Sequence, residues 1–243
     1  MINLTEDFER SVDEIVWSPD SKVIYFIAGN EIYNSIYKLD VVEEEIEIFH
    51  KDNYNTGIQI SKDGKTLYFL KQRTDLPAEI FSQSTDGKNT LKRVTFTNEE
   101  ILSQLEMNPV ETFWCEGANG DKVQSIIVKP PFFDPNKKYP MMFLIHGGPQ
   151  GAWEDNFHYR WNLQMFAGAG YVVIAPNPRG STGYGQKFTD EISGDWGGKV
   201  YTDLMNSYDY ALKNFSYIDA KNTFASGASY GGYMINWIEG HTD

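Results

Sequence analysis

A glycine-flanked serine is the residue of this chain best suited to nucleophilic chemistry. Ser229 lies in the run Gly-Ala-Ser-Tyr-Gly-Gly at positions 227–232, which fits the pattern Gly-x-Ser-x-Gly. Such a run makes a sharp turn between a strand and a helix and exposes the serine hydroxyl above a sheet. The apolar residues 233–238 favour a helix, whose positive N-terminal end would stabilise negative charge near Ser229. The sequence therefore predicts Ser229 as the nucleophile of a hydrolase.

A second glycine-rich turn supports this prediction. His-Gly-Gly-Pro occupies positions 146–149, directly after an apolar run. In α/β-hydrolases a turn at this place supplies one backbone N–H to the oxyanion hole, and the residue after the nucleophile supplies the other. We expect these donors to be Gly148, with Gly147 as the alternative, and Tyr230. His146 is expected to have a structural hydrogen-bonding role. The competing interpretation of Ser229 is an ordinary glycine-rich turn with a capping serine.

The other histidines are poor candidates for a general base. His241 would lie at the far end of the helix that Ser229 begins, roughly 18 Å away at the helical rise. His50 and His158 are expected to be surface or packing residues. An α/β-hydrolase supplies its acid and its histidine after the serine, whereas this sequence continues only to Asp243. We therefore expect the chain as given to be truncated, to lack the triad Asp and His, and to be inactive by itself.

Alternating strands and helices are predicted to position the serine. The apolar runs 141–145 and 171–175 are typical of strands buried on both faces of a parallel sheet. Helical spacing occurs at 161–167 and 200–214, and a short strand over 223–225 leads into the serine turn. This order predicts an α/β sheet with right-handed crossovers. Along the chain, we expect a pair of strands at 111–115 and 122–129 to come before this sheet.

The first part of the chain repeats itself. Segments 16–26 and 59–69 align with Ser18 and Ser61 43 residues apart, a period in the range of a four-stranded propeller blade. Two blades do not close a propeller, so residues 1–108 are expected to be the C-terminal blades of a larger one. The alternative is a small antiparallel sheet with accidental similarity. A helix over 98–107 is predicted before the domain boundary near Asn108.

Composition excludes several classes of partner and cofactor. The net charge of −13 would repel nucleic acid. One cysteine, Cys115, rules out an internal disulfide and a multi-cysteine metal site. The run Asn-Pro-Arg-Gly-Ser-Thr-Gly-Tyr-Gly at 177–185 lacks the phosphate-loop pattern; its Arg179 is expected to pair with an acid such as Asp195 or Asp203. We expect neither a cofactor nor a metal.

The sequence gives little indication of a membrane or a compartment. No run approaches the roughly 18 apolar residues that span a bilayer, and the first residues do not form a signal peptide. We expect a soluble protein without a membrane partner. Cytoplasm and periplasm stay open because a signal could lie upstream of the given sequence, and the oligomeric state is not predicted.

The combined motifs resemble the prolyl oligopeptidase family of serine peptidases, in particular its acylaminoacyl-peptidase and dipeptidyl-peptidase 5-like branch. The similar segments are 227–234, 146–149, 177–185 and the run Gly-Asp-Trp-Gly-Gly at 194–198, and they keep the family's order across 111–243. The resemblance implies part of a β-propeller over residues 1–108, followed over 109–243 by the N-terminal part of an α/β-hydrolase peptidase domain.

The resemblance also implies a reaction and a substrate. It indicates a fragment of a serine peptidase that hydrolyses short peptides through an acyl-enzyme on Ser229, with dipeptidyl- or aminopeptidase-like cleavage. The alternatives are an acylaminoacyl-peptidase, a small-ester hydrolase, or a non-catalytic propeller module that binds a partner. Only Ser229 as nucleophile, with Tyr230 and Gly148 as oxyanion donors, is carried over from the family, because the triad Asp and His have no counterparts here.

Overall fold

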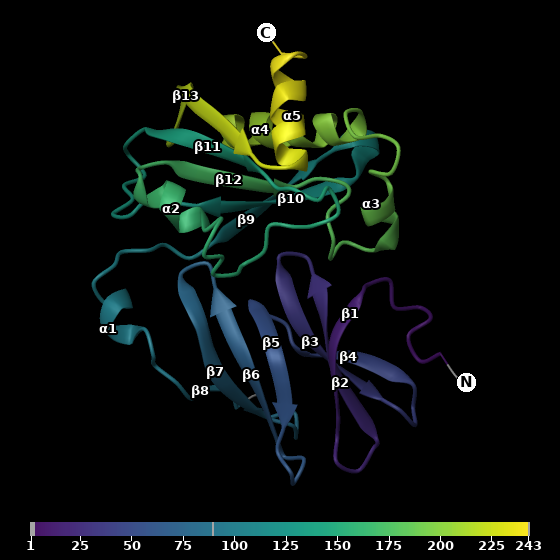
Figure 1. The fold of residues 1–243 in the computed structure, drawn as a ribbon. Helices are drawn as coiled ribbons and strands as arrows, with labels where there is room; N and C mark the ends of the chain where they lie inside the picture. The colour runs from purple at the N-terminus through teal and green to yellow at the C-terminus, as the bar shows by residue number, and fades with distance from the viewer. Residues whose placement is uncertain (1–2, 89, 243) are drawn as a thin grey trace. The chain divides into compact units, whose positions relative to one another are not determined.

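A computed structural model describes residues 3–88 and 90–242 of the chain. The residues form two compact units. The N-terminal unit runs to Leu105 and also includes Glu154–Phe157, whereas the C-terminal unit contains Glu106–Trp153 and the residues from His158 onward (Figure 1).

The N-terminal unit contains two antiparallel groups of four strands (Figure 1). Strands β1 to β4 pair in chain order, as do β5 to β8. The residue pair Asn34 and Tyr54 joins β3 to β5. The strands are β1 (Val12–Trp17), β2 (Val23–Asn30), β3 (Tyr33–Asp40), β4 (Glu45–His50), β5 (Tyr54–Ile60), β6 (Thr66–Arg73), β7 (Leu76–Ser84) and β8 (Lys92–Arg93).

The sequence repeat corresponds to a hairpin that is built twice. The Oγ atoms of Ser18 and Ser61 accept backbone N–H groups five residues later, at 2.9 Å from Val23 and 3.0 Å from Thr66. Each hydroxyl also donates to the aspartate two positions on, at 2.6 Å in both copies. The two serines therefore close equivalent turns, β1–β2 and β5–β6, in the two groups of strands.

Alternate residues of these strands form the core of the N-terminal unit. Tyr25 and Ile27 of β2 point to the same side because side chains alternate along a strand, and both are buried. The cluster includes residues of both groups: Tyr25, Ile27, Ile36, Ile58, Leu67, Phe69, Leu76 and Phe81. The two groups thus share one apolar core.

A short segment from later in the sequence completes this unit. Asp155 is 3% exposed, and its carboxylate accepts the backbone N–H and the hydroxyl of Thr74 at 2.9 and 3.0 Å. The other carboxylate oxygen accepts the Nδ2 of Asn53 at 2.6 Å, and the N–H of Asp155 donates to the carbonyl of Ile32 at 2.8 Å. Sequence patterns did not predict this insertion, because its contacts join residues about a hundred positions apart.

The C-terminal unit is built on a five-stranded sheet with the order β13-β11-β12-β10-β9. Strand β11 pairs in parallel with β12 and β13, but β10 pairs antiparallel with β9 and β12. The parallel pairing predicted for the strands over 141–145, 171–175 and 223–225 is confirmed, and the predicted strand pair forms the antiparallel hairpin β9–β10. The sheet as a whole is mixed rather than parallel, because β10 also joins β12 in the antiparallel direction. The strands are β9 (Glu111–Glu116), β10 (Lys122–Val128), β11 (Tyr139–Ile145), β12 (Val172–Asn177) and β13 (Ile218–Gly227).

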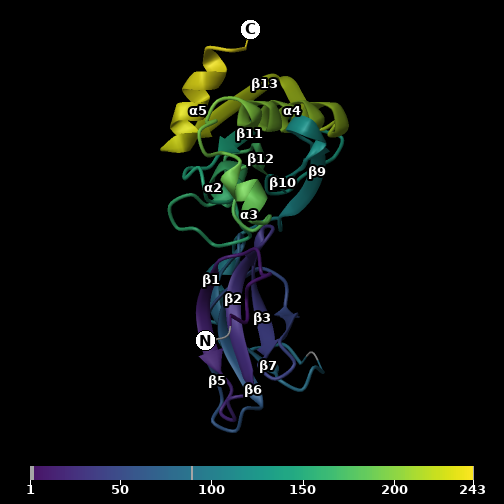
Figure 2. The ribbon, with the colours of Figure 1, turned by 90° about the vertical axis from the view of Figure 1, so that its right-hand side faces the viewer.

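Helices cover both faces of this sheet. Helices α4 and α5 pack on one face and α2 on the other (Figures 1 and 2). The helical segments of the chain are α1 (Glu99–Leu102), the 3-10 turn η1 (Ala118–Gly120), α2 (Leu163–Gly168), α3 (Gln186–Asp190), α4 (Lys199–Asn214) and α5 (Tyr230–Glu239).

The predicted helix over 98–107 is much shorter in the structure. Only Glu99–Leu102 is helical, and none of its residues is buried. The side chain of Asn98 makes no capping hydrogen bond, and Ile101 and Leu105 are 64% and 53% exposed. Because a short helix depends on packing of its apolar face, the segment does not extend to its predicted length.

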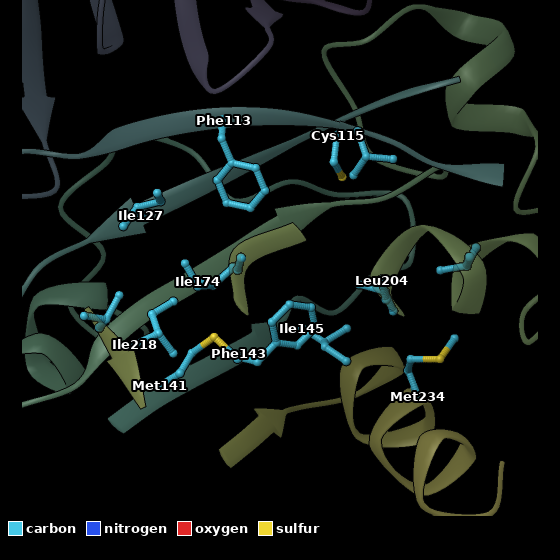
Figure 3. Packing of buried hydrophobic residues seen from close by; sticks show 14 of the residues in the cluster. Phe113, Cys115, Ile127, Met141, Phe143, Ile145, Ile174, Leu204, Ile218 and Met234 are labelled. Atoms are coloured by element: carbon cyan, nitrogen blue, oxygen red, sulfur yellow. The ribbon is translucent and has the colours of Figure 1, made fainter. Parts of the chain in front are cut away.

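The core of the C-terminal unit lies between the sheet and helices α4 and α5 (Figure 3). Met141, Phe143 and Ile145 alternate along β11 and face this core together with Leu204 of α4 and Met234 of α5. All five are at most 2% exposed. The end of β11, from which the glycine-rich turn leaves, is therefore firmly held.

Candidate active site

Ser229 sits on the strained turn that its glycines predict. Strand β13 ends at Gly227 and helix α5 begins at Tyr230. Between them, Ser229 has φ 56° and ψ −122°, a conformation unfavourable for a residue with a side chain. A Cβ at Gly227 would lie 2.6 Å from the carbonyl carbon of Gly231, so only glycine fits there. The serine is exposed at the top of this turn.

The register of the sheet brings this turn beside the His-Gly-Gly-Pro turn. Ile145, the last residue of β11, pairs with Gly227 at the end of β13. A Cβ at Gly231 would clash with the carbonyl oxygen of Ile145, so the start of α5 packs directly on the end of β11. A Cβ at Gly147 would lie 3.3 Å from the Cβ of Ser229 and 3.9 Å from its Oγ. The two motifs, whose nearest residues are 78 positions apart in the sequence, therefore meet at one edge of the sheet.

Two backbone donors near Ser229 are available to a ligand. Within residues 3–88 and 90–242, neither the N–H of Gly148 nor that of Tyr230 donates a hydrogen bond. Gly148 has φ 129°, a value that favours glycine, and Tyr230 is the first residue of α5. The geometry is suited to two N–H groups binding a negatively charged oxygen formed at Ser229.

The side chain of Tyr230 anchors the turn. Its hydroxyl donates to the carbonyl of Trp196 at 2.7 Å, and its ring meets the Trp196 ring edge-on at 5.6 Å. The residue is 4% exposed, and burial raises the pKa of its phenol. The phenol is therefore neutral and its role is structural.

His146 is held inside the turn rather than presented to Ser229. Its Nδ1 lies 2.8 Å from the carbonyl oxygen of Gly147, and its Nε2 lies 3.0 Å from the Oγ of Ser181. The imidazole is buried, and burial lowers its pKa. These contacts agree with the structural role expected for His146.

The remaining histidines are exposed, have other partners or belong to the N-terminal unit. The Nδ1 of His241 is 2.7 Å from the carbonyl of Trp237, at the end of α5, and the two rings stack at 4.1 Å. His158 is exposed, and His50 belongs to the N-terminal unit. Among the residues that the structure describes, no histidine hydrogen-bonds to Ser229.

The loop after β12 is organised by a buried ion pair. Arg179 Nε lies 2.8 Å from Oδ2 of Asp203, and both side chains are fully buried. Its Nη1 also donates to Glu191 at 2.6 Å. The predicted pairing is confirmed for Asp203 and is wrong for Asp195, whose carboxylate accepts the N–H of Gly198 at the start of α4.

Sequence patterns missed one residue that shapes the site. Asn177, the fully buried last residue of β12, hydrogen-bonds to both the backbone N–H and the carbonyl of Trp153. Its Oδ1 accepts the Trp153 N–H at 2.7 Å, and its Nδ2 donates to the Trp153 carbonyl at 2.8 Å. An amide at the end of an apolar strand was the available signal, although the sequence does not reveal its partner.

Over the described residues, no group of three or more His, Cys, Asp or Glu side chains is arranged to hold a metal ion. In the same ranges, no helix has the length and apolar character needed to span a bilayer.

Comparisons with known proteins agree with these features. Residues 157–243 match the model of the prolyl oligopeptidase family. The probable dipeptidyl-peptidase 5 of Arthroderma benhamiae is 38% identical over 249 residues, covering 98% of this chain and 33% of that protein. Dipeptidyl-peptidase 5 of Arthroderma otae is 39% identical over 240 residues, with the same coverage of each.

A solved structure shares the fold. An acylaminoacyl peptidase in complex with Z-Gly-Gly-Phe-chloromethyl ketone superposes with a TM-score of 0.86 at 25% identity, covering 99% of this chain and 37% of the other. The chain thus spans about a third of the length of the curated relatives that it matches.

Proposed function

The chain belongs to the prolyl oligopeptidase family, and we propose that it provides the nucleophile and oxyanion hole of a serine peptidase that cleaves short peptides. The observation that carries the proposal is the position of Ser229, on a strained exposed turn beside Gly147. This position combines a nucleophile with free backbone donors, as acyl transfer requires.

The proposed reaction proceeds through an acyl-enzyme. The Oγ of Ser229 attacks the peptide carbonyl carbon and loses its proton to a base, and the carbonyl oxygen becomes an oxyanion. The N–H groups of Gly148 and Tyr230 stabilise this oxyanion. The peptide bond breaks when the amine leaves with a proton, and water then hydrolyses the ester on Ser229. The described residues supply the nucleophile and the donors, but no histidine that reaches Ser229.

The proposed substrates are peptides with a free N-terminus. Support comes from the curated relatives, which are named dipeptidyl-peptidase 5. The similar solved structure is named an acylaminoacyl peptidase, which makes blocked N-termini the second candidate. A comparison of one peptide with a free and an acetylated N-terminus distinguishes the two.

We also propose that the N-terminal unit is two blades of a β-propeller. The support is the division of its strands into two antiparallel groups of four, each opened by the same serine-closed turn. A period of 43 residues is consistent with this assignment.

Active-site labelling tests the proposed function. The catalytically competent protein in which these residues occur is treated with a fluorophosphonate, and the modified residue is identified by peptide mapping. We expect labelling at Ser229, and loss of both label and peptidase activity in Ser229→Ala. Ser193→Ala, at an exposed serine of the C-terminal unit, is the matched control. Full activity of Ser229→Ala would exclude the proposal.

A further inference from the structure

A lysine and a histidine meet in the interior of the N-terminal unit. Lys71 of β6 is 7% exposed, and His50 of β4 is 9% exposed. The Nζ atom of Lys71 lies 2.9 Å from Nε2 of His50 and 3.4 Å from the carbonyl oxygen of Asp52. The contact joins the two groups of strands, and neither side chain takes part in the reaction proposed at Ser229.

The ammonium group of Lys71 is a buried cation without an anion beside it. Within the described ranges of the chain, no carboxylate lies at ion-pair distance from its Nζ. Burial lowers the pKa of Lys71 to about 8, although the charge of Asp52 opposes this shift. The charge of Arg73 lowers the pKa further, and that of Asp155 raises it. At about pH 7.5 the neutral amine is therefore about 10²-fold more abundant than in an exposed lysine, whose pKa is about 10.4.

The imidazole of His50 is a proton acceptor placed against this amine. An ammonium group only donates hydrogen bonds, so Nε2 of His50 accepts from Lys71, and the neutral ring has its proton on Nδ1. Burial, followed by the charge of Lys71, lowers the pKa of His50 to about 4. When Lys71 loses its positive charge, the second of these two effects disappears and the ring becomes more basic.

Apolar rings and one unpartnered amide surround the pair. The centre of the Phe81 ring lies 5.9 Å from Nζ of Lys71, and the rings of Phe69 and His50 are 5.2 Å apart. Gln83 is 5% exposed, and its amide oxygen has no hydrogen-bond partner among the described residues. The Gln83 side chain favours the protonated form of the His50 ring. The site therefore lacks an anion for Lys71 and a hydrogen-bond donor for Gln83.

We propose that Lys71 is a modification site that takes up carbon dioxide reversibly as a carbamate, with His50 as the proton acceptor. The lone pair of the neutral Nζ forms a bond to the carbon atom of carbon dioxide, and one C–O π bond breaks to leave a negative charge on oxygen. The nitrogen then loses a proton to Nε2 of His50. Counted from the ammonium form, the reaction releases one further proton to the solvent and uses no oxidant or reductant.

The carbamate form supplies both of the groups that the site lacks. An ammonium beside a neutral imidazole has a net positive charge, whereas a carbamate beside an imidazolium has none, and each charge has its opposite next to it. An imidazolium has two N–H groups, one for the carbamate of Lys71 and one for the amide oxygen of Gln83. Carbon dioxide is small and uncharged, so it enters apolar surroundings at a low desolvation cost.

Chemical trapping on the catalytically competent protein tests the proposal. The protein is incubated at about pH 7.5 with 13C-labelled bicarbonate and treated with triethyloxonium, which converts a carbamate into a stable ethyl ester, and its peptides are analysed by mass spectrometry. We expect the labelled ester at Lys71 to be at least about 10-fold more abundant than at the exposed Lys62 and Lys65 of the same sample. This comparison needs no variant, and sodium chloride in place of bicarbonate should give no ester.

Variants test the role of the base. His50→Gln keeps a polar side chain without a basic nitrogen and should lower the trapped ester at Lys71 by about 5-fold or more, whereas His158→Gln, at an exposed histidine, should not change it. Ser229→Ala should trap as much ester as the unaltered protein, so this proposal and the peptidase function are tested separately. No more ester at Lys71 than at Lys62, or equal trapping in His50→Gln with circular dichroism showing equal folding, would overturn the proposal.

Discussion

Arg179 and Asp203 form a bidentate ion pair in which both side chains are completely buried. Nε and Nη2 of Arg179 lie 2.8 and 3.0 Å from the two carboxylate oxygens. Asp203 also accepts the backbone N–H of Ala118 at 2.8 Å. The pair thus connects helix α4 to the β9–β10 hairpin and to the loop that contains Ser181, and Ser181 contacts His146.

Removal of one member of this pair should be strongly destabilising. Arg179→Met leaves a buried carboxylate without its cation, and we expect the free energy of unfolding to fall by about 3–5 kcal/mol. The double variant Arg179→Met with Asp203→Leu should lose less than the sum of the single changes. Urea unfolding, followed by a signal from the C-terminal unit, measures the free energy of unfolding of the single and double variants. Lys137→Met, in an exposed pair with Asp134, is the control and should leave the midpoint unchanged.

Loss of the Asp155 carboxylate should loosen the N-terminal unit. Asp155→Ala removes acceptors for the hydroxyl and N–H of Thr74 and for Asn53. We expect a loss of about 1–3 kcal/mol, with a smaller loss in Asp155→Asn, which keeps one oxygen. Hydrogen exchange should show faster exchange at the Thr74 amide. Asp86→Ala, in an exposed turn, is the control and should leave the exchange rate of the Thr74 amide unchanged. If this amide exchanges equally slowly in the unaltered chain and in Asp155→Ala, the inserted segment is dispensable.

Local patterns predicted the elements that contain the chemistry, and tertiary contacts decided the rest. The glycines of 227–232 predicted the strained turn because only glycine permits the close approach at Gly227. The apolar runs predicted β11 and β12 because both strands are buried on both faces. The pairing of β10 with β12 was not predictable in this way, because a buried strand reads the same in either direction.

Contacts between distant residues left no local signal of the partner involved. Asp155 and Asn177 are ordinary polar residues in the sequence, and their roles come from partners that folding brings to them. The helix predicted over 98–107 failed for a related reason, since Leu102 packs against the core of the N-terminal unit but Ile101 and Leu105 stay exposed. Sequence reasoning therefore identified Ser229 more readily than the groups that support its surroundings.

A buried histidine and lysine should make the N-terminal unit sensitive to acid. His50 Nε2 lies 2.9 Å from Lys71 Nζ, and both residues are buried. Burial, followed by the charge of Lys71, lowers the pKa of His50 from 6.5 to about 4. Burial also lowers the pKa of Lys71 to about 8.

The sign of the effect follows from the depressed pKa of His50. Between pH 6.5 and about 4 the unfolded chain binds a proton at His50 and the folded chain does not. The contribution of neutral His50 to the free energy of unfolding is therefore fully present above pH 6.5. It is lost as the pH falls, by at most about 1.4 kcal/mol per pH unit. Urea unfolding at pH 7 and pH 5 measures the loss. His50→Gln should flatten this part of the profile, whereas His158→Gln should not; a profile identical in all three proteins would contradict the assignment.

A methyl group at Gly147 should impair the turn without unfolding the protein. In Gly147→Ala the new Cβ would lie 3.1 Å from the carbonyl oxygen of Ala228 and 3.3 Å from the Cβ of Ser229. Because small displacements at a reacting centre lower turnover strongly, we expect kcat of the competent protein to fall by about 10 to 10²-fold. Gly168→Ala, at a position in α2 with open space around it, should retain full turnover. Unchanged kcat in Gly147→Ala would show that this turn does not govern the reaction.

These 243 residues alone should react slowly at Ser229. Among the described residues, no histidine hydrogen-bonds to the serine, since His146 is bound to Ser181 and His241 to Trp237. A serine hydroxyl without a general base is a weak nucleophile, even beside a formed oxyanion hole. We therefore expect fluorophosphonate labelling of the purified, folded chain at the rate seen in Ser229→Ala, with circular dichroism confirming equal folding. Rapid labelling that disappears in Ser229→Ala would mean that a base within this chain reaches the serine, and His146 would then be the first residue to substitute.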